Sequence, residues 1–326
     1  MALRAKLLGG GYYVPDRVLT NADLEKMVDT SDEWIVRRTG IRERRIADES
    51  MYTSDMAVIA AKRALENANT KAEELDLILI ATCTPDMFTP SVACMVQAQL
   101  GAPQAAAFDV NSACAGFIAA LTVANQFIGT GYYKKILVVG AENLSKMTDY
   151  KDRNTCILFS DGAGAFVVEA SEEKGVLATE IGADGESGKN LTSLAFRNDE
   201  AELAKRVSGN KATLWMDGSE VLKFAVRIMV QATRSVLDKA GLTLDDISLI
   251  VPHQANIRII DGAVKRLGIS PDKVFVNIEK YGNISSACIP IALCQALEEG
   301  KAKPGDKIVL VGFGGGLTWG AAVIEL

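Results

Sequence analysis

The sequence contains a single histidine, His253, among its 326 residues. A metal centre built from several histidines is therefore excluded, and we expect no bound metal. The six cysteines are scattered without a C-x-x-C pair, so a disulfide framework is not indicated. Walker, H-E-x-x-H, EF-hand and G-x-S-x-G motifs are all missing. Kinase, metalloprotease and α/β-hydrolase functions consequently lose their support.

Clustered positive charge and long apolar segments are also lacking. The net charge is −6 and the pI about 5.1, so we expect no nucleic-acid partner. The N-terminal stretch MALRAKLLGGGYYVP has no apolar core of the signal-peptide kind. The longest apolar run, residues 113–124, is too short to span a bilayer. We therefore predict a cytoplasmic protein without a membrane partner.

What the sequence does contain is an internal duplication. Three pairs of segments match at an offset of about 172 residues, which is too long for a solenoid repeat: 64–83 with 236–254, 111–121 with 285–297, and 134–142 with 306–314. In each pair, the two segments are predicted to form the same kinds of secondary-structure elements. The pattern favours two copies of one α/β unit, residues 1–173 and 174–326.

The hydrophobic patterns predict how these units are layered. Strands such as LDLILIAT are nearly continuous apolar runs, as expected where both faces of a sheet are covered. The helices that follow Cys114 and Cys288 are apolar around most of their circumference, which is typical of buried helices. The prediction is a five-layer α-β-α-β-α sandwich of two duplicated halves, with helix 56–67 on the outside. Residues 184–218 match nothing in the other half, and such insertions are often functional.

Cys114 lies in the turn of DVNSACAGF, directly before one of the predicted buried helices. Free N–H groups and the positive dipole at a helix N-terminus favour a thiolate, so Cys114 is a candidate nucleophile. The alternative interpretation is a buried core cysteine, and the position alone does not decide between them. Cys288 occupies the matching place in the second half and, two residues before Pro290, is interpreted as structural.

Two polar residues of the second half are candidates to join Cys114. His253 follows a predicted strand, at the end where α/β folds usually bind ligands, although a lone histidine is often structural. Asn283 lies in the turn before the second buried helix, where a G-N pair alone indicates only a turn. The duplication suggests that all three side chains meet between the halves. The glycine-rich segment 312–320 lacks a nucleotide-binding pattern, so we expect its bare N–H groups to face an oxyanion.

Taken in order, DVNSACAGF, DGAGA, HQANIRII, YGNISSA and GFGGGLTWG resemble β-ketoacyl-acyl-carrier-protein synthase III, a thiolase-fold condensing enzyme. With residues 30–46 the resemblance covers essentially the whole chain. It implies a thiolase-like fold and the initiating condensation of type II fatty acid synthesis. Acyl-CoA would acylate Cys114, and a decarboxylative Claisen condensation with malonyl-acyl-carrier protein would follow. The chain would act as an acyltransferase and a homodimer, with acyl-CoA as substrate and no cofactor.

The resemblance also implies roles for individual residues. The catalytic residues would be Cys114, His253 and Asn283, and the backbone N–H groups of Cys114 and Gly315 would form the oxyanion hole. Six residues would line the coenzyme A and phosphopantetheine tunnel: Thr30, Trp34, Arg38, Arg153, Gly218 and Asn256. A basic helix face would bind the acidic acyl carrier protein through Arg258, Lys265 and Arg266.

Two positions depart from the usual family pattern. Thr89 replaces the bulky aromatic of members that use short starters, which implies a deeper acyl channel reached across a dimer interface. Tyr281 replaces the histidine before Gly282 and Asn283, with little expected effect on the chemistry. A Cys-His-Asn acyltransferase that does not decarboxylate, or a specialised-metabolism condensing enzyme of the same fold, is the alternative function. A non-catalytic carrier-binding protein is disfavoured by the intact set of three residues.

Overall fold

Two β-sheets form the framework of the protein, seen here in a computed structural model that describes residues 3–197 and 199–326. The first sheet has the strand order β1-β7-β6-β4-β5 and the second β11-β12-β13-β8. The strands of the first sheet are β1 (Arg4–Tyr13), β4 (Leu77–Ala81), β5 (Ala106–Val110), β6 (Lys135–Asn143) and β7 (Asp161–Ser171). Those of the second are β8 (Gly175–Ala183), β11 (Leu249–Pro252), β12 (Lys307–Gly314) and β13 (Thr318–Glu325). Two small ribbons pair β2 (Val18–Thr20) with β3 (Glu43–Arg45) and β9 (Leu191–Thr192) with β10 (Trp215–Met216).

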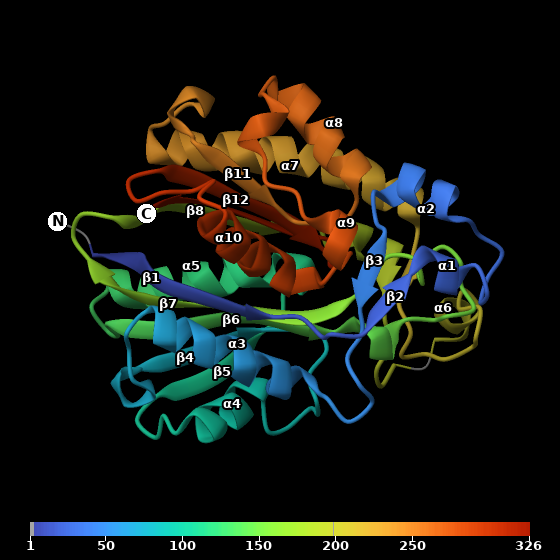
Figure 1. Cartoon of the computed structure of the whole chain (residues 1–326), viewed down its shortest axis with the longest axis horizontal. Coiled ribbons are helices and arrows are strands. Elements are labelled where there is room, and N and C mark those ends of the chain that lie inside the picture. The colour runs from blue at the N-terminus through green and yellow to red at the C-terminus, as the bar shows by residue number, and fades with distance from the viewer. Residues whose placement is uncertain (1–2, 198) are drawn as a thin grey trace.

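Helices cover the sheets on three levels, and α1, α2 and α6 lie beyond the ends of the sheets (Figure 1). The helices of the described residues are α1 (Asn21–Leu24), α2 (Asp32–Thr39), α3 (Thr53–Asn67), α4 (Val92–Leu100), α5 (Gly116–Gly129), α6 (Glu200–Leu203), α7 (Gly218–Ala240), α8 (Ile257–Leu267), α9 (Ile278–Tyr281) and α10 (Cys288–Glu298). Helices α3 and α4 cover the outer face of the first sheet, and α7 and α8 that of the second. Helices α5 and α10 lie between the sheets. The predicted five-layer sandwich, with α3 as an outer helix, is confirmed.

Strand β4 shows why the layers form. Leu77 and Leu79 pack with α5 and α10 in the central core, whereas Ile78 and Ile80 pack with α3 and α4. Side chains of a strand alternate between its faces, so a strand covered on both sides must be apolar at every position. All five residues of β4 are buried. The same reasoning explains α5, where burial of a residue such as Phe117 contributes about 1.5–3 kcal/mol.

The two halves repeat the same topology. Read from its first strand, the first sheet has the order first, last, fourth, second, third, and the second sheet has the order first, last, third, second. The second sheet lacks a full strand at the place of β5, where Val274 bridges to Ile250 instead. The chain passes from one sheet to the other between Ser171 and Gly175, and the halves are predicted to meet at residues 173 and 174. The first half also carries extra residues between its last two strands, residues 144–160 against 315–317 in the second half.

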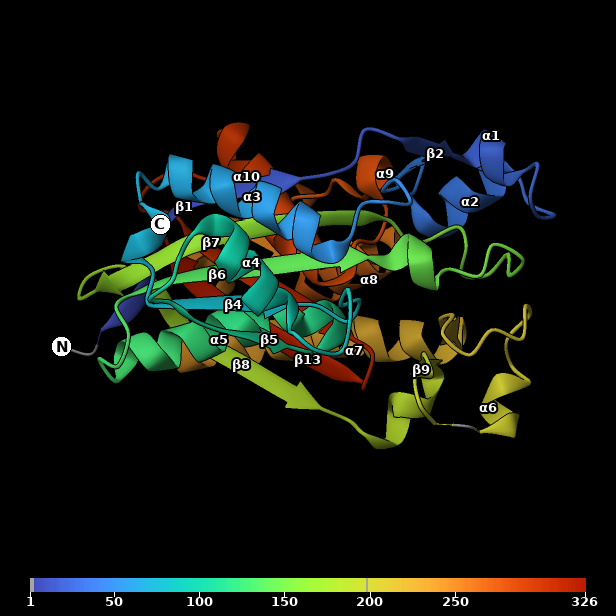
Figure 2. The same ribbon diagram turned by 90° about the horizontal axis from the view of Figure 1, so that it is seen from below.

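The segment 184–217 has a counterpart after all, in position though not in sequence. It joins β8 to α7, and residues 14–52 join the equivalent β1 to α3 in the first half. Both excursions lie at the same end of the molecule, away from the termini (Figures 1 and 2). The correspondence could not be recognised from the sequence, because the two connecting segments have unrelated sequences and different short elements.

Within residues 3–197 and 199–326, no helix has both the length and the apolar character needed to cross a membrane. The same residues contain no group of three or more His, Cys, Asp or Glu side chains arranged to hold a metal ion.

A substitution at Gly140 of β6 tests how tightly the two halves pack against each other. A Cβ atom there would lie 2.4 Å from the Ser286 carbonyl oxygen in the second half. Gly140→Ala should therefore destabilise the protein by about 1–3 kcal/mol through overpacking. Gly185→Ala is the matched control, because nothing lies within 4 Å of its Cβ position. Thermal unfolding should show a midpoint lowered by a few degrees for the first variant alone, and equal midpoints would contradict the packing described.

Candidate active site

Cys114, His253 and Asn283 line one cavity of about 670 Å³. Cys114 comes from the first half, at the start of the central helix α5, and the other two from the second half. His253 follows β11, and Asn283 precedes α10. The convergence that the duplication suggested is therefore present in the structure.

Cys114 lies in a short 3-10 turn, Ala113–Ala115, that leads directly into α5. The residue is half-buried. Burial raises the pKa of its thiol to about 12, the Ser285 hydroxyl acts in the opposite direction, and the Glu142 carboxylate raises the pKa further. Desolvation and the nearby negative charge therefore act against the thiolate that the helix end was expected to favour, and the nucleophilic role of Cys114 stays a prediction.

The imidazole of His253 has an unusual environment. Its backbone N–H donates to the Val311 carbonyl at 2.8 Å, and its ring lies edge-on to Phe313 at 5.4 Å between centroids. Neither ring nitrogen has a hydrogen-bond partner among the described residues. Burial lowers the pKa of His253 to about 3, so the ring is neutral at physiological pH. A buried, unpartnered imidazole beside a cavity is available to a ligand.

Asn283 is held by its backbone and by one side of its amide. Its N–H donates to the Leu158 carbonyl and its carbonyl accepts from the Ser160 N–H, both at 2.9 Å. The side-chain oxygen accepts the Ser285 N–H at 2.8 Å. Because the oxygen is occupied, the NH2 group is the part of the amide that remains to donate to a molecule in the cavity.

The glycine-rich strand end brings bare backbone against the cysteine. A Cβ atom on Gly314 would lie 2.4 Å from the Cys114 nitrogen, and one on Gly312 would lie 3.4 Å from the His253 Cβ. Any side chain at Gly314 would therefore displace the turn that carries the thiol. Gly315 follows directly, and its carbonyl accepts the Thr318 hydroxyl, which also bonds the Ser112 carbonyl at 2.9 Å.

The duplication pairs Cys114 with Ser286 rather than with Cys288. Ala113 and Ser285 both have left-handed backbones, with φ of 45° and 47°. Each donates its N–H to an asparagine two residues earlier, Asn111 in the first half and Asn283 in the second. The sequence match was displaced by two residues because the string S-A-C occurs in both turns at different places.

A second cavity of about 720 Å³ meets the first at Cys114. Phe159 and Leu191 also line both cavities, so the thiol lies at the junction of two spaces. One space contains His253 and Asn283, and the other extends past Phe88 and Gly315. Such an arrangement suits an elongated substrate that passes the cysteine.

The comparisons with known proteins agree over the whole chain. Residues 108–185 match the family described as 3-oxoacyl-[acyl-carrier-protein] synthase III, and residues 237–326 match its C-terminal domain. The chain is similar to the β-ketoacyl-[acyl-carrier-protein] synthase III of Oceanobacillus iheyensis, with 57% identity over 98% of both chains. The enzyme of that name from Caldanaerobacter subterraneus is 55% identical over 99% of this chain and 98% of its own. The crystal structure of the Aquifex aeolicus 3-oxoacyl-[acyl-carrier-protein] synthase III superposes with a TM-score of 0.92 at 51% identity, over 99% and 100% of the two chains.

The chain belongs to the β-ketoacyl-acyl-carrier-protein synthase III family. It is therefore an initiating condensing enzyme of fatty acid synthesis, and hence an acyltransferase. The resemblance inferred from the sequence motifs is confirmed.

The tunnel residues expected for a synthase III divide into two groups. Trp34, Arg38, Gly218 and Asn256 line the cavity that holds the three catalytic candidates. Arg153 is outside the lining, yet its guanidinium lies 4.6 Å from the Trp34 ring centroid, close to that of Arg38 at 5.1 Å. Two cations thus flank one indole at the cavity mouth, where phosphates would be attracted.

Thr30 is not among the residues that line the cavity, so its place in the tunnel stays a prediction. It precedes the N-cap residue of α2, Ser31, and its hydroxyl oxygen is buried without a hydrogen-bond partner among the described residues.

Thr89 is exposed and is not among the residues that line the two cavities of its own chain. Its neighbour Phe88 lines the second cavity instead and stacks on Phe196 at 4.7 Å between centroids. Within one chain, then, Phe88 and not Thr89 borders the space expected for the acyl group.

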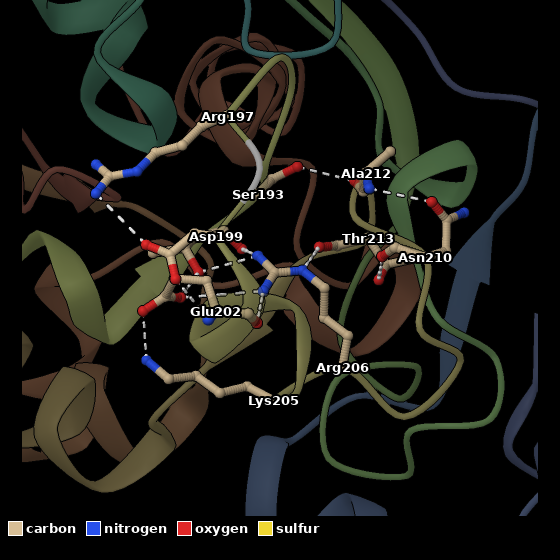
Figure 3. Close-up of polar contacts among 10 residues, drawn as sticks. Ser193, Arg197, Asp199, Glu202, Lys205, Arg206, Asn210, Ala212 and Thr213 are labelled. Carbon is tan, nitrogen blue, oxygen red and sulfur yellow. Dashed lines mark hydrogen bonds and ion pairs between the residues drawn. The ribbon is translucent and has the colours of Figure 1, made fainter.

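Sequence reasoning missed the part that segment 184–217 plays in a synthase III. Leu191, Trp215 and Met216 from this segment line the first cavity. Buried Arg206 organises the segment by donating to the carbonyl oxygens of Thr192, Glu202 and Thr213. Figure 3 shows its guanidinium at the centre of these contacts. The signal in the sequence was an insertion that is polar and contains several glycines, and this does not indicate which of its residues line a cavity.

The three basic residues expected to dock the carrier protein share helix α8. Arg258, Lys265 and Arg266 are exposed there, and Arg258 also borders the first cavity. The helix begins at Asn256, whose side chain accepts the Arg258 N–H at 2.9 Å.

His253 is the only histidine, so its ionisation can be followed without interference. Its pKa of about 3 predicts that an NMR signal from imidazole labelled with ¹³C at Cε1 stays constant from pH 5 to pH 8. A folded pKa below the unfolded value stabilises the protein above pH 6.5, and this contribution is lost as the pH falls toward 3. A titration midpoint near 6.5 would show that the ring is solvated instead.

Proposed function

We propose that this synthase III accepts an acyl group from acyl-CoA onto Cys114 and transfers it to malonyl-acyl-carrier protein. The observation that carries the proposal is the meeting of Cys114, His253 and Asn283 in one cavity, with both imidazole nitrogens unpartnered. The proposed chemistry uses side chains of this chain, with acyl-CoA as a substrate and no resident cofactor. The proposal includes a cytoplasmic location, where acyl-CoA is available.

In the first step the Cys114 sulfur attacks the acyl-CoA thioester carbon. The carbonyl oxygen becomes an oxyanion, and the backbone N–H groups of Cys114 and Gly315 are proposed to hold it. The coenzyme A thiolate then leaves and takes up the proton that the thiol has lost. Burial raises the pKa of Cys114, so the thiol has to lose this proton in the course of acylation.

In the second step malonyl-acyl-carrier protein replaces coenzyme A. Its thioester oxygen would accept hydrogen bonds from the neutral imidazole of His253 and the NH2 group of Asn283. Loss of CO2 leaves an enolate, whose negative oxygen these two donors stabilise. The enolate carbon attacks the acyl group on Cys114, and the sulfur leaves as the β-ketoacyl product forms. Exposed cations on α8 would bind the acidic carrier protein.

Substitutions should separate the two steps. Cys114→Ala should abolish acylation, whereas His253→Ala and Asn283→Ala should retain it and lose about 10²–10³-fold in decarboxylation, the usual effect of removing an oxyanion donor. Mass spectrometry of the acyl adduct and release of labelled CO2 measure these steps. Cys94→Ala, at an exposed cysteine, is the control and should change neither. Loss of acylation in the His253 variant would overturn its assigned role.

We also propose that the protein is a homodimer in which Thr89 borders the acyl channel of the partner. Strand β5 is an edge of the first sheet, and Phe108 on it and Phe88 nearby are exposed, with Phe88 at 73%. An apolar sheet edge of this kind is usually covered. A threonine at position 89 would leave the channel deep, so starters longer than acetyl are proposed.

Thr89→Phe tests this arrangement. The larger side chain should reduce turnover of medium-chain acyl-CoA by roughly tenfold or more while acetyl-CoA turnover persists. Thr130→Phe, at the exposed end of α5, should leave the chain-length profile unchanged. An unaltered profile in the Thr89 variant would remove the residue from the channel.

A further inference from the structure

Glu142 on β6 is fully buried yet has no role in the chemistry described above. No lysine or arginine pairs with it among the ion pairs of residues 3–197 and 199–326. Burying a carboxylate without a counter-ion is costly unless hydrogen bonds replace its hydration. The carboxylate therefore has to be held by donors, and their identity indicates its purpose.

The two oxygens of this carboxylate serve different halves of the protein. Oε2 accepts the Cys83 N–H at 3.1 Å and the Thr84 hydroxyl at 2.7 Å, both in the turn after β4. Oε1 accepts the hydroxyls of Ser285 at 3.0 Å and Ser286 at 2.8 Å, in the turn before α10. Glu142 thus fastens the turn that contains Asn283 to the half that carries Cys114.

Ser285 passes this restraint on to Asn283. Its N–H donates to the Asn283 side-chain oxygen at 2.8 Å, which orients the amide with its NH2 group toward the cavity. The backbone of Ser285 has a φ of 47°, a left-handed conformation that residues other than glycine rarely occupy. A bond from its hydroxyl to a rigid buried carboxylate stabilises that backbone.

The duplication explains why a glutamate, Glu142, occupies this position. Gly140 and Gly312 are equivalent, since each meets the turn before a central helix, and two residues further along each strand lie Glu142 and Gly314. Gly314 leaves the Cys114 nitrogen accessible, whereas Glu142 points its carboxylate at the equivalent Ser286, 3.5 Å from the Ser286 nitrogen. The second copy of the nucleophile turn is thereby filled by an anion of the protein itself.

The effect of Glu142 on the nucleophile has the wrong sign for a role in acylation. Its negative charge raises the pKa of the Cys114 thiol and so disfavours the thiolate. Burial raises the pKa of Glu142 as well, opposed by the hydrogen bonds that it accepts. Its hydrogen bonds, by contrast, reach the turn of Asn283 through Ser285.

We propose that Glu142 is a positioning residue for decarboxylation, which acts through Ser285 to aim the amide of Asn283 at the malonyl thioester. The proposal rests on the proposed function, because it assigns Asn283 to the second step. It predicts that weakening the link slows decarboxylation more than it slows acylation of Cys114.

Two serine variants provide a matched test. Ser285→Ala and Ser286→Ala each remove one hydroxyl from the same carboxylate oxygen, but only Ser285 bonds to Asn283. Ser285→Ala should reduce CO2 release from malonyl-acyl-carrier protein by about tenfold, as expected for a misplaced catalytic group. Ser286→Ala should change it by less than about threefold and should acylate Cys114 at the wild-type rate. Ser285→Ala also removes a hydroxyl that lowers the pKa of the Cys114 thiol, so its acylation should fall as well, but by less than its decarboxylation.

Variants of Glu142 itself test the charge. Glu142→Gln keeps an acceptor for the Cys83 N–H and presents an NH2 group to the serine hydroxyls, so decarboxylation should persist. The same variant should shift the pH profile of Cys114 alkylation by iodoacetamide to lower pH, because it removes a negative charge near the thiol. Glu142→Ala should lose decarboxylation as Ser285→Ala does. If the alanine variant does not fold, the glutamine and serine variants carry the test.

The outcomes separate the two proposals. A wild-type protein that fails to release CO2 overturns the proposed function and this inference with it. A wild-type protein that decarboxylates, together with a Ser285→Ala variant that matches Ser286→Ala in both steps, overturns the inference alone. Equal loss of acylation and decarboxylation in Ser285→Ala would show a general structural role and would also overturn it.

Discussion

The site depends on a close approach of bare backbone between the two halves. Where β6 and β12 meet the turns before α10 and α5, a Cβ atom on Gly140 or Gly314 would lie 2.4 Å from the opposing backbone. Side chains there would separate the sheets from the central helices and displace both turns. Since one turn carries Cys114 and the other Asn283, the same contact that seals the core also sets the distance across the cavity.

Burial favours the neutral forms of two groups in this cavity, since desolvation lowers the pKa of His253 and raises that of Cys114. Glu142 is a buried carboxylate near Cys114, and it accepts hydrogen bonds from the turn before α10, which is the copy of the turn that carries the cysteine. The duplicated fold thus has two equivalent helix ends with different surroundings, one that brings a cysteine to the cavity and one that receives a carboxylate of the protein itself.

The core and the identity of the catalytic candidates could be predicted, because both rest on local patterns. The apolar run at 77–81 required cover on both faces, and the matched segments required two equivalent sheets. Other features could not be judged from local patterns. They are the residue of the second half that is equivalent to Cys114, the ionisation of the Cys114 thiol, and the surroundings of Thr30 and Thr89. Each depends on backbone conformation, solvent exclusion or side-chain direction, and none of these is a property of a residue type.

The sequence by itself determined the layers of the fold, the duplication and the family, because hydrophobic period and motif order are linear features. Only the tertiary structure decided which residues share the cavity, that segment 184–217 forms its wall, and that Glu142 joins the two halves. The physical reason is that desolvation and hydrogen bonding act between groups far apart in the chain, such as Glu142 and Ser285.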